Sequence, residues 1–220
     1  MSKRLLFVVS EDWYFCSHRL HLAKDAVEAG YQVALLSRFA EHRAIVEEAG
    51  IETIDWTFDR RSHNPFQEIR AIASVISALR KFRPDLVHAV AIKPVLYTAF
   101  ASRCTRVRSC VFALGGLGYI FMANTLAAKI TRFFVSFAFK IALSGKNSRL
   151  ILQNSDDQDV LLAAKVIDKA RIRLVRGAGV DTELFSPQTP PAGTPLVILP
   201  ARMLWDKGVG EFVACARALR

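Results

Sequence analysis

The feature that most constrains the fold of this chain is a regular alternation of short apolar runs with segments of helical periodicity. Strands are predicted at residues 5–10, 31–37, 51–56, 86–89, 110–114, 149–153 and 172–175. Helices are predicted between them, at residues 17–29, 40–49, 67–82, 94–104 and 124–143 and from residue 155. This alternation, sustained over most of the chain, predicts an α/β fold with a doubly wound, Rossmann-like parallel sheet.

The turn after the first predicted strand argues against a common class of nucleotide-binding enzyme. A dinucleotide-binding domain places G-x-G-x-x-G there, whereas this chain reads SEDWYFCSH, with two carboxylates and no glycine. His18 and His21 lie three residues apart, but two histidines with no third ligand at suitable spacing make a weak metal site. We therefore expect no nicotinamide cofactor and no metal ion.

The formal net charge of +10 indicates an acidic partner: a nucleic acid, an anionic lipid or a phosphorylated substrate. The basic residues are spread over many predicted elements without a recognition motif, so nucleic acid is the weakest of the three. No 18 consecutive residues are apolar and uncharged, so no membrane span is expected. The apolar run at residues 5–9 is too short for a signal peptide, and the four cysteines have neither metal-site nor disulfide spacing. These features favour a cytoplasmic protein.

A second domain is predicted to begin near residue 196. Residues 186–195, SPQTPPAGTP, have the composition of a linker, which divides the chain into a domain at 1–187, a linker at 188–195 and a first βα unit at 196–220. In that unit an apolar strand at residues 195–199 precedes Arg202, Lys207 and a helix. Cations beside a helix N-terminus favour an anion, and we expect the diphosphate of a sugar nucleotide. The alternative is that both are solvated loop charges.

The chain resembles the family 4 glycosyltransferases in several motifs that occur in the same order. The run PARMLWDKGV at residues 200–209 resembles the start of the family's second domain. Residues 176–187 resemble its Gly-x-Gly-Val-Asp…Phe-x-Pro run before the hinge. Family members are retaining enzymes with the GT-B fold of two Rossmann-like domains. The resemblance therefore implies the N-terminal half of a GT-B fold with a truncated second domain, in which Arg202 and Lys207 grip the donor diphosphate and supply catalysis.

His88 begins the run HAVAIKPVLY at the carboxyl edge of the predicted sheet, where such sheets bind ligands. The run resembles the subgroup that extends sugar chains on polyprenyl-diphosphate lipids, whose matching segment also carries Ile-Lys-Pro. Many family members have a second histidine where this chain has Val90, so His88 and Lys93 are both candidates for substrate binding and Lys93 is the stronger one. The alternative is a packed histidine and a lysine whose ammonium group reaches solvent.

Three glycines, Gly115, Gly116 and Gly118, follow a predicted strand and allow a close approach of the backbone to a ligand. A plain tight turn is the alternative. The family has a similar Gly-Leu-Gly, which implies a loop facing the interdomain cleft, and Gly179 in the run before the hinge is a further candidate for substrate binding. Ser155, followed by Asp156 and Asp157, is predicted to be a helix N-cap instead of part of a metal site.

The helix predicted at residues 124–143 is a candidate membrane contact. Lys129, Arg132 and Lys140 fall in one narrow stripe, and large apolar residues cover most of the remaining surface. Such a helix suits shallow insertion at an anionic lipid surface. The alternative is a helix buried on two sides with a thin solvated stripe.

The resemblance implies transfer of a hexosyl or N-acetylhexosaminyl unit from a nucleotide-diphosphate sugar to a polyprenyl-diphosphate-linked saccharide, in the synthesis of surface polysaccharide or glycan. It implies no metal, and a cytoplasmic protein held peripherally at the inner face of the cell membrane. We expect the 220-residue chain to be inactive alone, since a GT-B site lies between two domains. The alternatives are a fragment of a GT-B-type sugar-nucleotide 2-epimerase, or a non-catalytic or relic domain that binds membranes or polyanions.

Overall fold

One parallel sheet of seven strands is the framework of the computed structural model, which describes residues 2–59, 64–105, 107–117, 135–145, 147–189 and 192–219. The spatial order is β3-β2-β1-β4-β5-β6-β7. The strands are β1 (Arg4–Glu11), β2 (Gln32–Arg38), β3 (Glu52–Asp55), β4 (Leu86–Val90), β5 (Ser109–Leu114), β6 (Ser148–Leu152) and β7 (Ile172–Leu174). The chain reverses its direction of winding between β1 and β4, which is the doubly wound order. The predicted fold class is confirmed.

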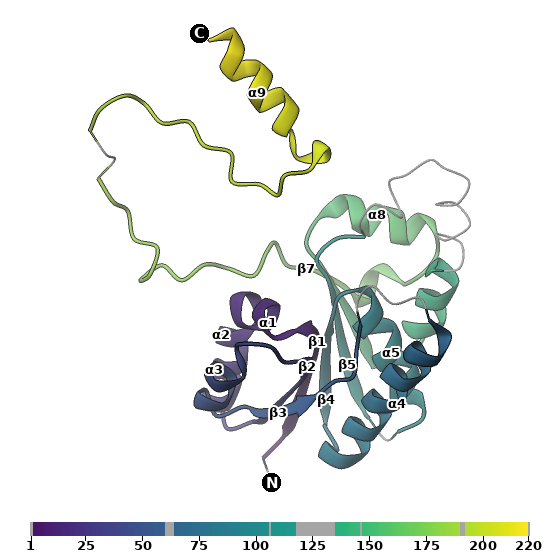
Figure 1. Ribbon diagram of the computed structural model, residues 1–220. Helices are drawn as coiled ribbons and strands as arrows, with labels where there is room; N and C mark the ends of the chain where they lie inside the picture. Colours follow the sequence, from purple (N-terminus) through teal and green to yellow (C-terminus); the bar gives the residue numbers. More distant parts are fainter. Residues whose placement is uncertain are drawn as a thin grey trace. The chain divides into compact units, whose positions relative to one another are not determined.

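Helices cover both faces of this sheet (Figure 1). One face carries α1 (Asp12–His18), α2 (Leu20–Glu28) and α3 (Arg43–Glu48). The other face carries α4 (Pro65–Phe82), α5 (Ile92–Arg103), α8 (Ser155–Ala163) and the helical residues 135–142. The short helix η1 (Lys169–Arg171) precedes β7. The helices therefore form two layers with the sheet between them.

Alternate residues of each strand supply two separate cores, because successive side chains of a strand point to opposite faces. In β1, Leu6 and Val8 belong to the core beneath α4 and α5, whereas Leu5, Phe7 and Val9 belong to the core beneath α1–α3. Burial on both faces explains why the central strands, such as β1 and β2, appear in the sequence as apolar runs.

The helix predicted at residues 17–29 is in fact two helices, and the first begins earlier. α1 starts at Asp12, directly after β1, and the chain bends at Arg19, whose φ of −137° and ψ of −10° are not helical. Ser17 therefore caps no helix, and its hydroxyl instead donates to the carbonyl of Trp13 (2.9 Å). The bend is the local feature on which the candidate site depends.

Both carboxylates of the turn after β1 are engaged by the protein itself. Glu11 forms an ion pair with Arg38 of β2 (3.0 Å). Asp12 is fully buried, and its Oδ2 accepts hydrogen bonds from the backbone N–H groups of Ala40 (2.8 Å) and His42 (2.9 Å). These bonds fix the chain after β2 against the start of α1.

The turn between β4 and α5 contains a strained residue. Ala91 has φ +82° and ψ 163°, a conformation that costs a non-glycine residue about 1–3 kcal/mol. Its N–H donates to the carbonyl of Ala113 in β5 (3.0 Å). This bond fixes the strained turn at the carboxyl edge of the sheet, and α5 begins at Ile92, two residues before the predicted start.

Residues Val180–Arg220 form a second compact unit, apart from Met1–Gly179. It contains the short helix η2 (Trp205–Lys207) and α9 (Val209–Ala218), which confirms the helix predicted after Gly208. The strand predicted at residues 195–199 does not form among the described residues, and Leu196 and Val197 are largely exposed. A strand needs a neighbour that supplies matching N–H and C=O groups, and the described part of this unit contains no other strand.

Candidate active site

A cavity of about 280 Å³ opens at the carboxyl ends of β5, β6 and β7, against the bend between α1 and α2. Its wall includes His88 from β4, Gln153 after β6 and Gly177 after β7, together with His18, Arg19 and Asp25 from the helices. Doubly wound sheets bind their ligands at this edge. The cavity is therefore the candidate site of the first unit.

His88 is the sequence-predicted residue that the structure places in this cavity. It lies in the middle of β4, not at its end, and packs edge-to-face on Phe7, with ring centroids 5.3 Å apart. Only 6% of the residue is exposed, and Nε2 is buried with no hydrogen-bond partner among the described residues. Burial, aided by the positive charge of Arg19, lowers the pKa of His88 to about 4. The ring is therefore neutral at pH 7, and it is packed in the core while it borders the cavity.

Arg19 is a cavity residue that sequence reasoning missed. Its Nη1 donates to the carbonyl of His18 (2.7 Å), and its Nε is buried with no partner among the described residues. The signal available in the sequence was Ser17-His18-Arg19 shortly after the first strand. A helix predicted as continuous over residues 17–29 concealed it, because only the bend places this side chain at the sheet edge.

His18 is held in one orientation beside the cavity. Its ring stacks on Tyr14, with centroids 4.3 Å apart, and Nδ1 lies 3.2 Å from the Tyr14 carbonyl and 2.7 Å from the Ser17 hydroxyl. A carbonyl only accepts hydrogen bonds, so this geometry favours the tautomer with the proton on Nδ1. Over the described ranges, no group of three His, Cys, Asp or Glu side chains is placed to hold a metal ion.

The glycine loop lies next to the cavity. A Cβ at Gly115 would stand 3.7 Å from Gln153 Oε1 and 3.7 Å from the Tyr14 hydroxyl. Two residues further on, the N–H of Leu117 donates to Asp157 Oδ2 (3.2 Å). The loop is therefore tied to the start of α8 at one end and lies close to polar side chains at the other.

The other glycines predicted to bind substrate differ in backbone conformation and in their position relative to the cavity. Gly116 has φ +157° and Gly179 has φ +83°, and the latter value is one that L side chains rarely adopt. Gly177, not Gly179, lines the cavity. Gly118 lies outside the described residues.

The start of α8 corrects one prediction by a single residue. The helix begins at Ser155 as predicted, but its N-cap is Asn154, whose Oδ1 accepts from the N–H of Asp157 (2.7 Å). In return, Asn154 Nδ2 donates to Asp157 Oδ2 (3.0 Å). The Asp157 carboxylate therefore joins the helix start to the glycine loop.

Lys93 lies on the opposite face of the sheet from His88. Its Nζ stands 2.8 Å from Glu68 Oε1 of α4 and 5.9 Å from the centre of the Phe58 ring. Glu68 also accepts a hydrogen bond from the hydroxyl of Tyr97. The structure therefore does not bring Lys93 together with His88, and a contact between Lys93 and substrate stays a prediction.

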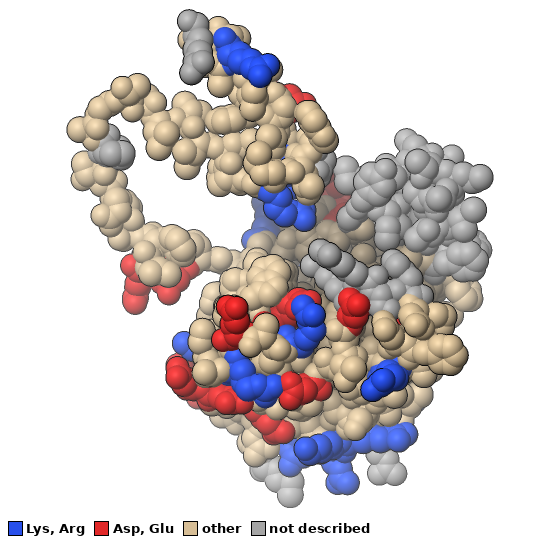
Figure 2. Space-filling model, viewed as in Figure 1, with Lys and Arg blue, Asp and Glu red and all other residues tan. Residues whose placement is uncertain are grey.

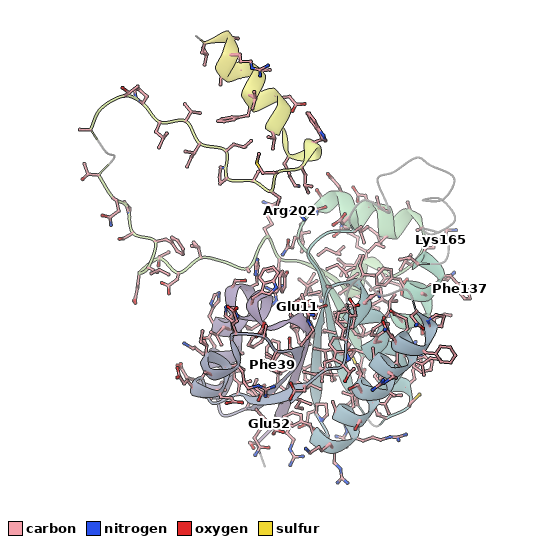
Figure 3. The ribbon with its side chains drawn as sticks, viewed as in Figure 1. Glu11, Phe39, Glu52, Phe137, Lys165 and Arg202 are labelled. Atoms are coloured by element: carbon pink, nitrogen blue, oxygen red, sulfur yellow. The ribbon has the colours of Figure 1, made fainter. Side chains whose placement is uncertain are left out.

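One of the three predicted membrane-facing cations can be placed. Lys140 is exposed on the helical residues 135–142, beside Phe137 (58% exposed) and Ile141 (49%), and Figure 3 shows Phe137 pointing away from the rest of the unit. Phe139 on the same segment is fully buried in the core. Lys129 and Arg132 lie outside the described residues. Of the helices that the structure describes, none is long and apolar enough to cross a membrane.

Arg202 and Lys207 belong to the second unit, and both are exposed. Gly208, with φ +75°, joins η2 to α9, so Lys207 directly precedes the N-terminus of a ten-residue helix. The ring of Trp205 lies so close that a Cβ at Gly210 would come within 2.8 Å of it. One cation, Lys207, therefore lies beside a helix start, and diphosphate binding by Arg202 and Lys207 stays a prediction.

Outside the cavity, the surface of the described residues offers a shallow hollow and mixed charge. Figure 2 shows basic and acidic side chains interspersed over the face in view, with a row of basic side chains along its lower edge. A shallow hollow of about 590 Å³ lies on the C-terminal half of α4, lined in part by Arg80 and Lys81. This half of α4 runs back towards the amino edge of the sheet, away from the edge where ligands of such folds bind.

The chain is similar in sequence or in structure to several known proteins. Over 215 residues the chain is 20% identical to N,N'-diacetylbacillosaminyl-diphospho-undecaprenol alpha-1,3-N-acetylgalactosaminyltransferase of Campylobacter jejuni, with 92% of this chain and 57% of that protein covered. A glycosyltransferase from Rickettsia africae matches all of this chain and 58% of its own, at 18% identity and a TM-score of 0.70. The UDP-GlcNAc 2-epimerase of Methanocaldococcus jannaschii matches less well, with a TM-score of 0.53 and 14% identity. That match covers 79% of this chain and 45% of the epimerase chain.

The structural matches and the sequence match show different things about this chain. The chain spans well under two thirds of the length of each of these relatives, and the structural matches, at their low identity, show the fold. The family follows from the sequence match instead: residues 4–155 fit the model of the glycosyl transferase 4-like proteins, which covers β1 to the first residue of α8. The chain therefore belongs to the glycosyl transferase 4-like family.

Proposed function

We propose that this chain is the acceptor-side part of a retaining glycosyltransferase. It transfers a hexose or N-acetylhexosamine from a nucleotide-diphosphate sugar to a polyprenyl-diphosphate-linked saccharide. The observation that carries the proposal is the likeness, over 215 residues, to an enzyme named as an N-acetylgalactosaminyltransferase acting on a diphospho-undecaprenol. The likeness to the 2-epimerase extends to the fold alone and favours no second function.

The proposed roles follow the two units. In the first unit, the cavity at the carboxyl edge receives the acceptor, with hydrogen-bonding groups supplied by His88 and Gln153. In the second unit, Arg202, Lys207 and the N-terminus of α9 stabilise the diphosphate that leaves the donor. Positive groups in fixed positions suffice for this step, so the proposed chemistry uses no metal ion.

A membrane surface is part of the proposal, because polyprenyl-linked acceptors reside in membranes. The outward side of residues 135–142 offers Phe137, Lys140 and Ile141 to that surface, while Phe139 packs inward. Apolar side chains beside a cation suit shallow insertion among anionic lipids. The partner membrane would then present the acceptor to the unit that binds it.

The test is a transfer assay with a two-domain protein in which this chain continues into a complete donor-binding domain. A panel of UDP-linked hexoses and N-acetylhexosamines is offered with a short-chain polyprenyl-diphosphate disaccharide, and products are identified by mass spectrometry. We expect the acceptor to gain one sugar. NMR of the product should show that the anomeric configuration of the donor is retained. Release of an epimerised sugar, or no extension with any donor, would reject the proposal. The 220-residue chain alone is the control and should give no product.

A further inference from the structure

Two of the residues that line the cavity beside the α1–α2 bend each have a buried polar atom that lacks a partner within the described part of the chain. Arg19 Nε and His88 Nε2 are both buried, and neither has a hydrogen-bond partner among the described residues. They come from different parts of the fold, the bend and the middle of β4, yet both residues line the same cavity. Buried polar atoms without hydrogen-bond partners are unfavourable, so a ligand or water that supplies hydrogen-bonding groups beside them is favoured.

The positive charge of Arg19 favours one chemical class of ligand in the cavity. Arg19 carries a full positive charge, and no carboxylate of the described residues lies within ion-pair distance of it. Asp25 borders the cavity, but it is exposed at the rim. A guanidinium group matches the spacing of oxygens on a phosphoryl group or carboxylate, and it binds them more strongly than it binds neutral groups.

His88 fits the same ligand as a neutral donor. Burial, and to a smaller extent the positive charge of Arg19, lowers the pKa of His88, so the ring stays uncharged near pH 7. With its proton on Nε2, it donates one hydrogen bond to an oxygen that also faces Arg19. In that tautomer, two residues that differ in charge, one from the bend and one from β4, border the same cavity.

The size of the cavity limits what enters it. At about 280 Å³ it is just below the range of roughly 300–1,000 Å³ that accommodates a whole small-molecule ligand. It therefore fits one group of a larger substrate, and the remainder would leave past the exposed His21 and Asp25.

We infer that this cavity is a phosphoryl-binding subsite, in which Arg19 and His88 hold the diphosphate of the acceptor. This inference rests on the proposed function, which supplies a diphosphate on the acceptor and assigns the donor diphosphate to Arg202 and Lys207. The subsite would place the acceptor saccharide at a fixed distance from its lipid anchor.

The experiment measures binding by the full 220-residue chain, by calorimetry, with three probes: farnesyl diphosphate, inorganic pyrophosphate and UDP. We expect farnesyl diphosphate and pyrophosphate to bind, and Arg19→Gln to weaken both about tenfold or more. Arg19→Lys keeps the positive charge but loses the paired N–H donors of the guanidinium group. Its affinity for both probes should lie between those of the parent and of Arg19→Gln. Lys24→Gln removes one exposed charge from α2 away from the cavity and should stay within twofold of the parent.

Each contrary result overturns the inference. If Arg19→Gln binds pyrophosphate as the parent does, the cavity holds water only. If Arg19→Gln and Lys24→Gln weaken binding equally, attraction is non-specific. If UDP alone shows Arg19-dependent binding, the subsite belongs to the donor.

A second measurement covers the case in which Arg19→Gln fails to fold. In the parent chain, the side-chain nitrogen resonance of His88 should shift on addition of pyrophosphate, and an unchanged resonance at saturation would reject the subsite. Binding is read without any sugar transfer, so this test stands apart from the transfer assay. If the protein extends acceptors but shows no Arg19-dependent binding, the proposed function stands and the proposed subsite is rejected.

Discussion

The carboxylate of Asp12, at the start of α1, accepts a hydrogen bond from the N–H of Ala40, 28 residues away, at 2.8 Å. The same oxygen accepts from the N–H of His42, and the other carboxylate oxygen accepts from Trp13 (2.8 Å). Burial by itself raises the pKa of Asp12. The three hydrogen bonds, with a smaller contribution from the nearby His42 ring, lower it further than burial raises it, so the pKa lies below its usual value.

A pKa lowered by folding means that the ionised Asp12 stabilises the native state. This stabilisation is present above the unfolded pKa of about 3.9 and is lost as the pH falls through the lower native value. Asp12→Asn should reduce the free energy of unfolding at pH 7 by about 1–3 kcal/mol. It should also make the free energy of unfolding fall less steeply as the pH drops below 4. Urea unfolding at pH 7 and pH 3.5 measures both effects, and the control is Glu41→Gln, on the loop whose N–H groups bind Asp12. Equal losses in the two variants would contradict the prediction.

His88 should give the folded state a second pH dependence, at higher pH. The unfolded chain binds a proton as the pH falls below about 6.5, whereas the native ring, with a pKa of about 4, does not. Stability from this group is therefore complete above pH 6.5, declines as the pH falls from 6.5 to 4, and is constant below. The decline should amount to about 3 kcal/mol. His88→Phe keeps the contact with Phe7 and should flatten the curve in that window; a curve of unchanged slope would count against a neutral buried ring.

The start of α8 allows a direct comparison between two neighbouring residues. Asn154 accepts the hydrogen bond of the N-cap, and Ser155 is the first helical residue. Asn154→Ala should therefore lower the free energy of unfolding by about 1 kcal/mol, the usual cost of a lost cap, while Ser155→Ala should change it little. Thermal or urea unfolding of both variants decides, and the reverse order of effects would restore Ser155 as the N-cap.

The membrane contact predicts a difference between two charge reversals. Lys140→Glu should reduce flotation of the chain with anionic vesicles, since a basic residue near such a surface contributes about 1 kcal/mol and reversal roughly doubles the loss. Lys24→Glu on α2, at the opposite face of the sheet, carries the same change of charge and should bind like the parent. Binding should also weaken with salt. Failure of the parent to float at low salt would remove the membrane from the proposal.

The diphosphate contact of the second unit predicts losses of rate without losses of fold. In the two-domain protein, Arg202→Ala and Lys207→Ala should each lower kcat by about 10²–10³, the usual effect of removing one donor from a developing negative charge. Circular dichroism checks that each variant is folded. Rates within a few-fold of the parent in both would show that the diphosphate binds elsewhere.

The sequence predicted the sheet well because its central strands, such as β1 and β2, are buried on both faces and are therefore largely apolar. It could not predict the bend at Arg19, since neither proline nor glycine marks it and tertiary contacts determine it. The partner of Lys93 was equally hidden: Glu68 lies on a different helix, and no local spacing connects the two. The run at residues 195–199 shows the opposite error, because apolar composition indicates a strand but only a neighbouring strand makes one.

The strand order described above also has a consequence for synthesis on the ribosome. β1 is made first, and the two strands beside it, β2 and β4, follow; β3 adds to β2, and β5, β6 and β7 each add to the strand made just before. Every strand after the first therefore emerges when its partner already exists. The sheet can grow outward from β1 in the order of translation, and no strand after β1 has to wait, with its backbone unpaired, for a first neighbour still to be made.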